Sequence, residues 1–555
     1  MSLCSHQTQR WSMLSMLLIV IASLVRQPAF TPGWFFTSDV IFVAEAYITS
    51  PGALPPHRQR QFLQEMTRKL VTVKPGQLST GQLAQAPDLM YAWSHCSQVN
   101  KENALAVESL VKRLVDEQRA GNRQALNVLT VDDYNCLLEG WARAGQGVAA
   151  AERCEQIVTA MLEQGPQPNL SSFKAVLMAW RLSWNLADFA PLRAQRILEQ
   201  MIRLYESGEH DAVLPDADCF DIVLQLWSRS RHGQAPQQTE QLLAVMEALY
   251  KSTGRANLKP RTTSFNAVLA AWAKTSGQAT DPHVAQAAAE RACHVLSFME
   301  MLHARGDDTV APDNASYCTV MGALTHTADS AAAARQADAF LRRLEASALA
   351  TMTPNGRGRL VPDTILFNTA MGLWAKANVK GAYRKARSIL DRQLALYDAG
   401  WRKCKPDVYG FTSVIASCAA EMGPKAEKQK AFSVATATFT QLQERPELGD
   451  GPNHVTYGAM LKACAKLLPS SSPLRQEWAR RVFEDCCRKG YVGDMVVSRL
   501  REAASPDMYK ELMQGHGRRD LPSQWTVNVH EMNAFRRKKS TGSVSSANRR
   551  KRAEV

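Results

Sequence analysis

Residues 265–274 read FNAVLAAWAK, and residues 367–376 repeat the same pattern as FNTAMGLWAK. In both, an aromatic side chain is followed after three, four and seven residues by further apolar side chains. This spacing places all of them on one face of an α-helix. Because a helix with one apolar face buries it against another element, the sequence predicts helices packed on helices.

The same pattern occurs in eight segments of the chain. The position seven residues after the aromatic is tryptophan in five of them, and Leu324, Cys418 or Cys464 in the others. Internal repetition at a regular spacing is typical of repeat architectures. The eight aromatic residues are Tyr134, Phe173, Phe220, Phe265, Tyr317, Phe367, Phe411 and Tyr457.

A proline stands five residues before seven of the eight aromatics. Proline does not continue a preceding helix, so it marks the start of the next one. Between each pattern helix and the next proline lies a second amphipathic run, such as 192–205 or 383–397. Each unit is therefore predicted to be helix, turn, helix. The aromatics are 39 to 52 residues apart, and the polar or glycine-rich excess indicates loop insertions.

These features predict an all-α protein, an α-solenoid of about nine helix-turn-helix repeats. Met90 and Trp93 mark a degenerate first unit. The predicted order is a targeting leader, cleaved or disordered, at 1–55, a linker or first helix at 56–82, the repeat array at 83–490, capping helices at 491–520 and a basic disordered tail at 521–555.

Composition narrows the class of protein. The 555 residues are 45% hydrophobic and 21% charged, which excludes a mostly disordered chain. The net charge of +14 suits a polyanionic partner, although a merely basic soluble protein would have the same balance. The tail holds the cluster Arg536, Arg537, Lys538 and Lys539. This cluster is predicted to clamp phosphates; a nuclear signal and a solubilising tail are the alternatives.

The N-terminus carries the one prominent apolar run, residues 13–25. It is shorter than the ~20 residues of a spanning helix, so no stable membrane span is expected. The run has the length of a signal-peptide core. Ala29-Phe30 after it resembles the bipartite leaders that reach plastids. We expect an organelle, plastid or mitochondrion; a buried N-terminal helix is the alternative for this segment.

Motifs for catalysis are absent from the sequence. It has no P-loop, GxGxxG, HExxH or GxSxG, and its 12 cysteines form no CxxC. Adjacent Cys486 and Cys487 could be a metal or redox pair, but helix packing is the favoured interpretation. We therefore predict no enzyme activity, cofactor, metal or small-molecule substrate. A protein partner would supply any catalysis.

The pattern aromatic-x-x-Val-Leu-x-x-Trp-Ala-Lys, closed by Pro-Asp, resembles the pentatricopeptide repeat. The resemblance covers about residues 83–490, although the units exceed the family's ~35 residues. It implies a right-handed solenoid that binds single-stranded RNA, one base per repeat, for organellar RNA processing, stability or translation. The alternative is a tetratricopeptide-like scaffold that binds protein and has no preference for RNA.

The resemblance also implies which residues read the bases: those after each aromatic, together with those after each closing proline. Their short polar groups suit Watson–Crick edges, but Asp and Asn also cap helices, so capping alone is the alternative. The first set is Asn135, Lys174, Asp221, Asn266, Cys318, Asn368, Thr412 and Gly458. The second set is Asn169, Asp216, Arg261, Asp313, Asp363, Asp407 and Asn453.

The family's code, carried over, predicts the RNA 5′-C-N-N-U-N-U-A-3′. Its fixed letters come from Asn135/Asn169 for C, Asn266/Asp313 and Asn368/Asp407 for U, and Thr412/Asn453 for A. In the family, an apolar residue two before the aromatic also wedges between bases. Ile365, Tyr409 and Val455 fit this role, whereas Asp132, Ser171, Asp218, Thr263 and Ala315 do not. The N-terminal repeats are therefore expected to grip RNA weakly.

Overall fold

The computed structural model describes residues 56–94, 101–122, 128–144, 147–183, 188–208, 211–350, 361–449, 451–517 and 520–529. Helices are the only regular elements in these ranges, which confirms the predicted all-α class. The predicted leader and the basic cluster Arg536–Lys539 lie outside the described residues.

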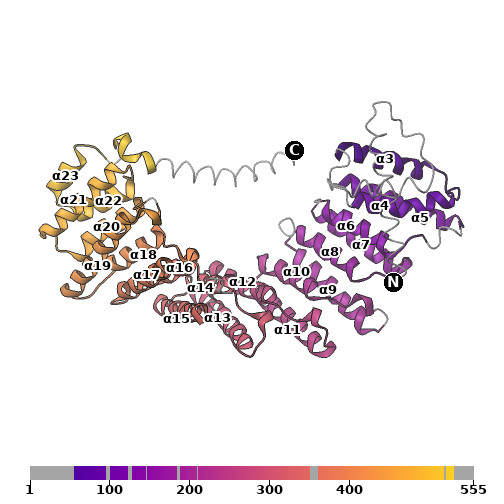
Figure 1. Ribbon diagram of the computed structural model, residues 1–555, viewed down its shortest axis with the longest axis horizontal. Coiled ribbons are helices and arrows are strands. Elements are labelled where there is room, and N and C mark those ends of the chain that lie inside the picture. The colour runs from indigo at the N-terminus through magenta and orange to yellow at the C-terminus, as the bar shows by residue number, and fades with distance from the viewer. Residues whose placement is uncertain are drawn as a thin grey trace. The chain divides into compact units, whose positions relative to one another are not determined.

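The chain divides into two compact units, residues 1–271 and 272–555, and the boundary falls inside α12 (Thr262–Gln278). The first unit contains the helices from indigo to magenta in Figure 1. They are α3 (Pro56–Thr72), α4 (Thr80–Ser94), α5 (Lys101–Arg119), α6 (Val131–Arg143), α7 (Val148–Gln164), α8 (Leu170–Leu182), α9 (Ala190–Glu206), α10 (Ala217–Arg229) and α11 (Ala235–Thr253).

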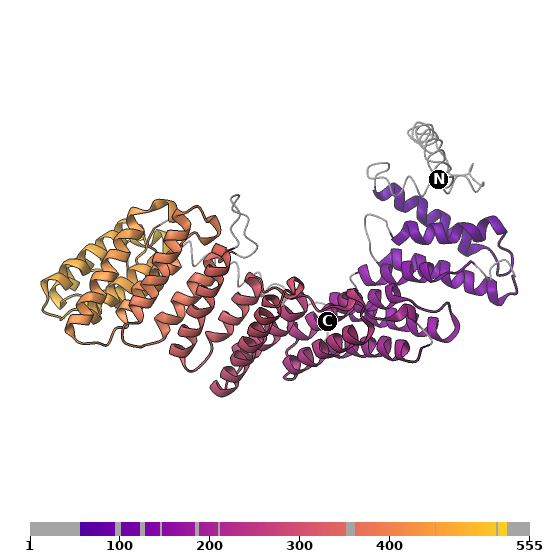
Figure 2. The same ribbon diagram turned by 60° about the horizontal axis from the view of Figure 1, so that its bottom comes forward.

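The second unit continues with helix pairs of the same kind. Figure 2 shows its orange and yellow helices lying side by side. The helices are α13 (Pro282–Ala304), α14 (Asn314–Leu324), α15 (Ser330–Ala350), α16 (Thr364–Lys376), α17 (Ala382–Asp398), α18 (Val408–Ala419), α19 (Lys425–Glu444), α20 (His454–Leu467), α21 (Pro473–Arg488), α22 (Asp494–Ala503) and α23 (Pro506–Met513).

Packing follows one rule within each unit. The helices that carry the aromatic pattern, together with α4 and α22, are called first helices here, and the helix after each is its second helix. A first helix packs on its second helix, as α16 does on α17, and on the first helix of the next pair. In the second unit α14, α16, α18, α20 and α22 contact one another in this order. The first helices of a unit therefore form a continuous row.

The core consists of the apolar faces that the sequence pattern predicts. Phe173, Phe220, Phe367, Phe411 and Tyr457 are almost fully buried. Four of the repeated tryptophans also tie their first helix to the helix before it. Their indole N–H groups donate to polar side chains at 2.7–2.9 Å: Trp93 to Thr67, Trp141 to Glu108, Trp180 to Glu155 and Trp227 to Gln195.

The start of each first helix is fixed by its proline and by a short turn. All seven closing prolines are buried. A 3₁₀ turn precedes five of them, as at Asp211–Val213 and Arg402–Cys404, and buries an apolar side chain such as Val213 or Cys404. Because proline lacks the N–H that would continue a helix, these segments hold the chain at the entry of the next first helix.

Several cysteines fill small spaces in this core. Cys154, Cys219, Cys418 and Cys464 are fully buried and form no disulfide. Burial raises the pKa of the Cys154, Cys418 and Cys464 thiols to about 12. These thiols therefore stay protonated at neutral pH and pack as small apolar groups.

Candidate nucleic-acid interface

Most of the residues that follow the closing prolines cap the first helices. Asp363 shows the arrangement: its Oδ1 accepts a hydrogen bond from the Leu366 N–H at 3.0 Å. Capping is therefore confirmed for these side chains, although a carboxylate with two oxygens can accept a second bond. The capping residues are Asn169, Asp216, Asp313, Asp363, Asp407 and Asn453.

The structure also brings members of the two predicted sets together. The Nδ2 atom of Asn368 on α16 donates to both carboxylate oxygens of Asp407, the cap of α18, at 3.0 Å. In the first unit, Asn135 Nδ2 on α6 lies 3.4 Å from Oδ1 of Asn169, the cap of α8. In these two pairs, the residue after the aromatic thus faces the cap of the next first helix.

Four of the predicted reading residues are held in an ionic network along α8, α10 and α12. Lys174 Nζ lies 2.5 Å from Asp216 Oδ2 and 3.1 Å from Asp218 Oδ2. Arg261 then joins Asp218 and Asp221 at 2.7 and 2.8 Å. Asp221 is buried, so its carboxylate depends on these partners. The side chains of this network satisfy one another.

The network shifts the protonation of its members. Hydrogen bonds from Arg261 and then Lys174 hold the pKa of Asp218 below its usual 3.8, against a smaller effect of burial. Burial opposes the charge of Lys174, but its bonds to Asp216 and Asp218 outweigh burial and raise the pKa. Asp218 and Lys174 are therefore both charged at neutral pH.

We expect the first unit to lose stability more steeply below pH 4 than a variant without the network. A depressed Asp218 pKa contributes stability above the unfolded value of 3.8, and that contribution is lost as pH falls through the folded pKa. Asp218→Asn should cost about 0.2–1 kcal/mol at neutral pH, since the pair is partly exposed. Urea unfolding at pH 7 and pH 3 measures both values; an equal cost at both would contradict the assignment.

The remaining predicted positions are less uniform. Thr412 on α18 meets Thr456 of α20 at 2.7 Å between hydroxyl oxygens. Cys318 on α14 is half-buried, and burial together with Asp363 and Asp313 raises its thiol pKa to about 12. Asn266 and Asp313 belong to different units.

Four first helices at the C-terminal end of the array, α16, α18, α20 and α22, share a feature. Each has an exposed apolar side chain two residues after its cap. Ile365 is 62% exposed, Tyr409 60%, Val455 41% and Met495 39%. These four residues are called the apolar ladder here. Because α16, α18, α20 and α22 contact one another in turn, the ladder follows a single row of helices. Exposed apolar side chains at one repeated position are typical of a binding surface.

Sequence reasoning missed Met495. Its helix lacks the closing proline and the aromatic, since Val492 precedes the cap Gly493 and Val497 takes the aromatic position. A β-carbon placed on Gly458 would lie 3.2 Å from Met495 Cε, so this methionine covers the glycine at the predicted reading position of α20. The signal that could have found it is the constant spacing of two residues from cap to ladder.

Basic side chains follow on the same helices. Lys376 near the end of α16 and Lys466 near the end of α20 are exposed, and Lys462 is half-buried. Lys462 and Lys466 lie seven and eleven residues after Val455, a spacing that keeps them on its helix face. None of the ion pairs found in the described ranges involves these three lysines. They leave positive charge beside the ladder.

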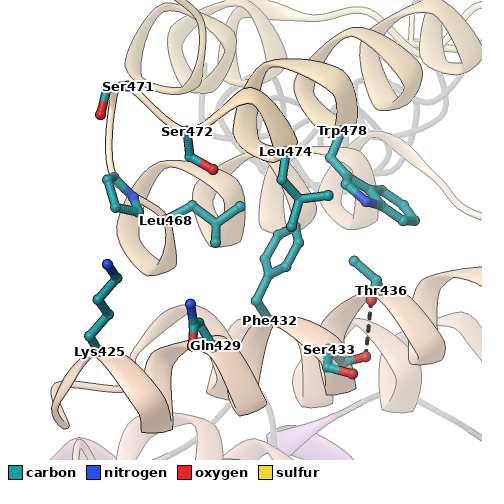
Figure 3. A pocket seen from close by; sticks show the side chains of 11 residues that line it. Lys425, Gln429, Phe432, Ser433, Thr436, Leu468, Ser471, Ser472, Leu474 and Trp478 are labelled. Atoms are coloured by element: carbon teal, nitrogen blue, oxygen red, sulfur yellow. Dashed lines mark hydrogen bonds between the residues drawn. The ribbon is translucent and has the colours of Figure 1, made fainter.

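A separate groove lies between two second helices. Figure 3 shows Phe432 of α19 and Leu474 of α21 pointing toward one another, with Trp478 beside them. Leu474 is 44% exposed, and the Phe432 and Trp478 rings meet edge to face at 6.2 Å. None of the predicted base-reading residues lines this groove.

No helix in the part of the chain that the structure describes is long and apolar enough to cross a membrane. No group of three His, Cys, Asp or Glu side chains there could hold a metal ion. No protein-family model matches the sequence, and no curated protein matches it either.

Proposed function

We propose that the chain is a sequence-selective single-stranded RNA-binding protein of the pentatricopeptide type. Its first helices would form the binding row of a right-handed α-solenoid of about nine repeats. The observation that carries the proposal is the apolar ladder with polar reading residues between its steps. The protein would serve organellar RNA processing, stability or translation by covering RNA, without a reaction of its own.

Stacking gives the ladder its role. Bases of a single strand are splayed out and stack on aromatic or flat apolar side chains, each worth about 1–3 kcal/mol. Tyr409 presents an aromatic ring at 60% exposure, and Ile365 flanks the same slot from α16. Lys376, Lys462 and Lys466 would neutralise phosphates along this row, so binding should weaken as salt rises.

The polar pair between two ladder residues would choose the base. Asn368 directs its amide nitrogen toward Asp407, while its oxygen is buried. The pair therefore offers an N–H donor and a carboxylate acceptor, which complement a uracil carbonyl and N3–H. Thr412 offers a hydroxyl that can donate to the acceptor nitrogen of adenine. These assignments support U and then A on α16 and α18.

Because of the ionic network in the first unit, we expect the RNA to bind mainly to the second unit. Lys174 is held by Asp216 and Asp218. Arg261 is held by Asp218 and Asp221. A base that used them would have to break these pairs without regaining their energy. The ladder position of α10 is Asp218, whose charge disfavours both stacking and phosphates. We therefore propose that α8 and α10 space the RNA rather than read it.

Selection from a random RNA pool with the full chain at physiological salt tests the proposal. We expect enrichment of U-N-U-A, the segment assigned to α12 through α20. Exchanging the reading residues, Asn368→Thr with Thr412→Asn, should shift the preferred letters and lower affinity for the original RNA about tenfold or more. Thr369→Ala, on the same helix, is the matched control and should change neither letter nor affinity. Retention of no RNA would overturn the proposal.

The groove of α19 and α21 favours a second candidate, a protein-binding scaffold of the tetratricopeptide type. An exposed leucine above an aromatic pair suits an apolar side chain of a partner. Leu474→Asp should then abolish capture of that partner while leaving RNA binding intact. Capture that is unchanged by Leu474→Asp would exclude the groove as the site.

A further inference from the structure

A third side chain accompanies the reading pairs, and the sequence pattern did not single it out. It stands three residues after the cap of the next first helix, and it is a hydroxyl residue in the three cases that follow. In each, the hydroxyl meets the reading residue of the preceding first helix. The pairs are Ser172 with Asn135 at 2.7 Å, Ser264 with Asp221 at 2.5 Å and Thr456 with Thr412 at 2.7 Å.

The helix start decides which way this hydroxyl points. The backbone N–H of the cap donates into it, at 3.2 Å from Asn169 to Ser172 and at 3.4 Å from Asn453 to Thr456. Because the oxygen already receives a hydrogen, its own hydrogen is left to donate. Asn135 accordingly turns its oxygen toward Ser172 and its nitrogen toward Asn169. The reading group is held in one orientation.

Asn368 has no such hydroxyl, since the residue three after the next cap is Gly410; the same position holds Cys219 after Asp216 and Leu366 after Asp363. The Oδ1 of Asn368 is buried and has no hydrogen-bond partner among the described residues. A β-carbon on Gly410 would lie 2.9 Å from that oxygen and 2.8 Å from Met371 Cε. In the pair of α6 and α8, the position of Met371 is occupied by the shorter Leu138. Compared with the pair of α6 and α8, Met371 therefore stands in the place of a leucine and Gly410 in the place of a serine.

We propose that a hydroxyl residue three after a cap is a positioning residue, which sets the base selectivity of the preceding first helix by fixing its reading side chain. This inference rests on the proposed function and deepens it. Either hydroxyl of the Thr412–Thr456 pair can donate, and we assign the shared hydrogen to Thr456. The Thr412 hydroxyl is then left to donate to the base. At Asn368 only Asp407 sets the orientation, and a serine at residue 410 would add the missing donor.

The first test compares Thr456→Val with Thr456→Ser. Valine keeps the volume and removes the hydroxyl, so the preference for A over G at the Thr412 slot should fall about three- to tenfold. Serine should restore it. Thr239→Val is the matched control, because the Thr239 hydroxyl bonds only within α11, to the Pro236 carbonyl at 2.7 Å. Equal weakening of all RNAs by Thr456→Val, with the preference kept, would overturn the inference.

The second test needs no RNA. Met371→Leu with Gly410→Ser copies the Leu138 and Ser172 arrangement, and it should raise the thermal midpoint by about 2–4 °C. The gain should vanish in an Asn368→Ala background, as a double-mutant cycle measures. The same gain in both backgrounds would overturn the inference. A chain that bound no RNA would end the proposed function, whereas the cycle would still decide whether residue 410 positions residue 368.

Discussion

A chain with Ile365→Ala and Tyr409→Ala is expected to bind its selected RNA about 10- to 100-fold more weakly than the unchanged chain at the same salt concentration. Both side chains are about 60% exposed and stand at the same position of neighbouring first helices. Stacking of a base is worth about 1–3 kcal/mol, and each 1.4 kcal/mol is tenfold in affinity. Folding should be nearly unchanged, because exposed side chains contribute little to the core.

Fluorescence anisotropy with a short U-N-U-A RNA measures this loss. Leu349→Ala is the matched control, since Leu349 is 58% exposed but lies on the second helix α15. The loss should persist at high salt, because stacking is apolar, whereas a loss through phosphate contacts would shrink. Equal affinities of the double variant and the Leu349 variant would remove the ladder from the interface.

Trp227→Ala should cost about 3–5 kcal/mol of stability in the first unit. The side chain is 1% exposed, and its indole N–H donates to Gln195 Oε1 at 2.8 Å. The substitution leaves a cavity between α10 and α9. It also leaves the Oε1 atom of Gln195 without this donor. Because repeat arrays are stabilised between neighbours, hydrogen exchange should accelerate first in α8 to α11.

Two further variants separate packing from hydrogen bonding at this tryptophan. Gln195→Leu keeps the ring but leaves its N–H without an acceptor, which should cost about 1–3 kcal/mol. Trp227→Phe keeps part of the ring volume and should fall between the two. Urea unfolding of the three variants gives the order. A Trp227→Ala protein as stable as the Gln195 variant would show that packing at this site contributes little.

Local sequence information predicted the helical fold well, and the reason is visible at single positions. Phe367 and Trp374 recur at a helical spacing, and both are buried on one face of α16. Pro362 and Asp363 are adjacent in sequence, so the helix start could be placed directly. Periodicity and caps depend on residues within one or two turns, which a linear pattern contains.

The site was harder to predict because its groups come from different helices. Asp221 and Arg261 each matched a reading position when taken one at a time, but they neutralise one another across 40 residues of chain. The role of Ser172 depends on Asn135, 37 residues earlier. Such pairings arise only when consecutive first helices pack, and the sequence pattern treats each helix separately.

The buried thiols make stability measurable helix by helix. Cys154, Cys219, Cys418 and Cys464 sit in four different helices and are fully enclosed in the folded chain. An alkylating reagent reaches such a sulfur only when its helix opens, so the labelling rate reports the free energy of that opening. Mass spectrometry of the labelled peptides would resolve these openings along the array without any engineered probe.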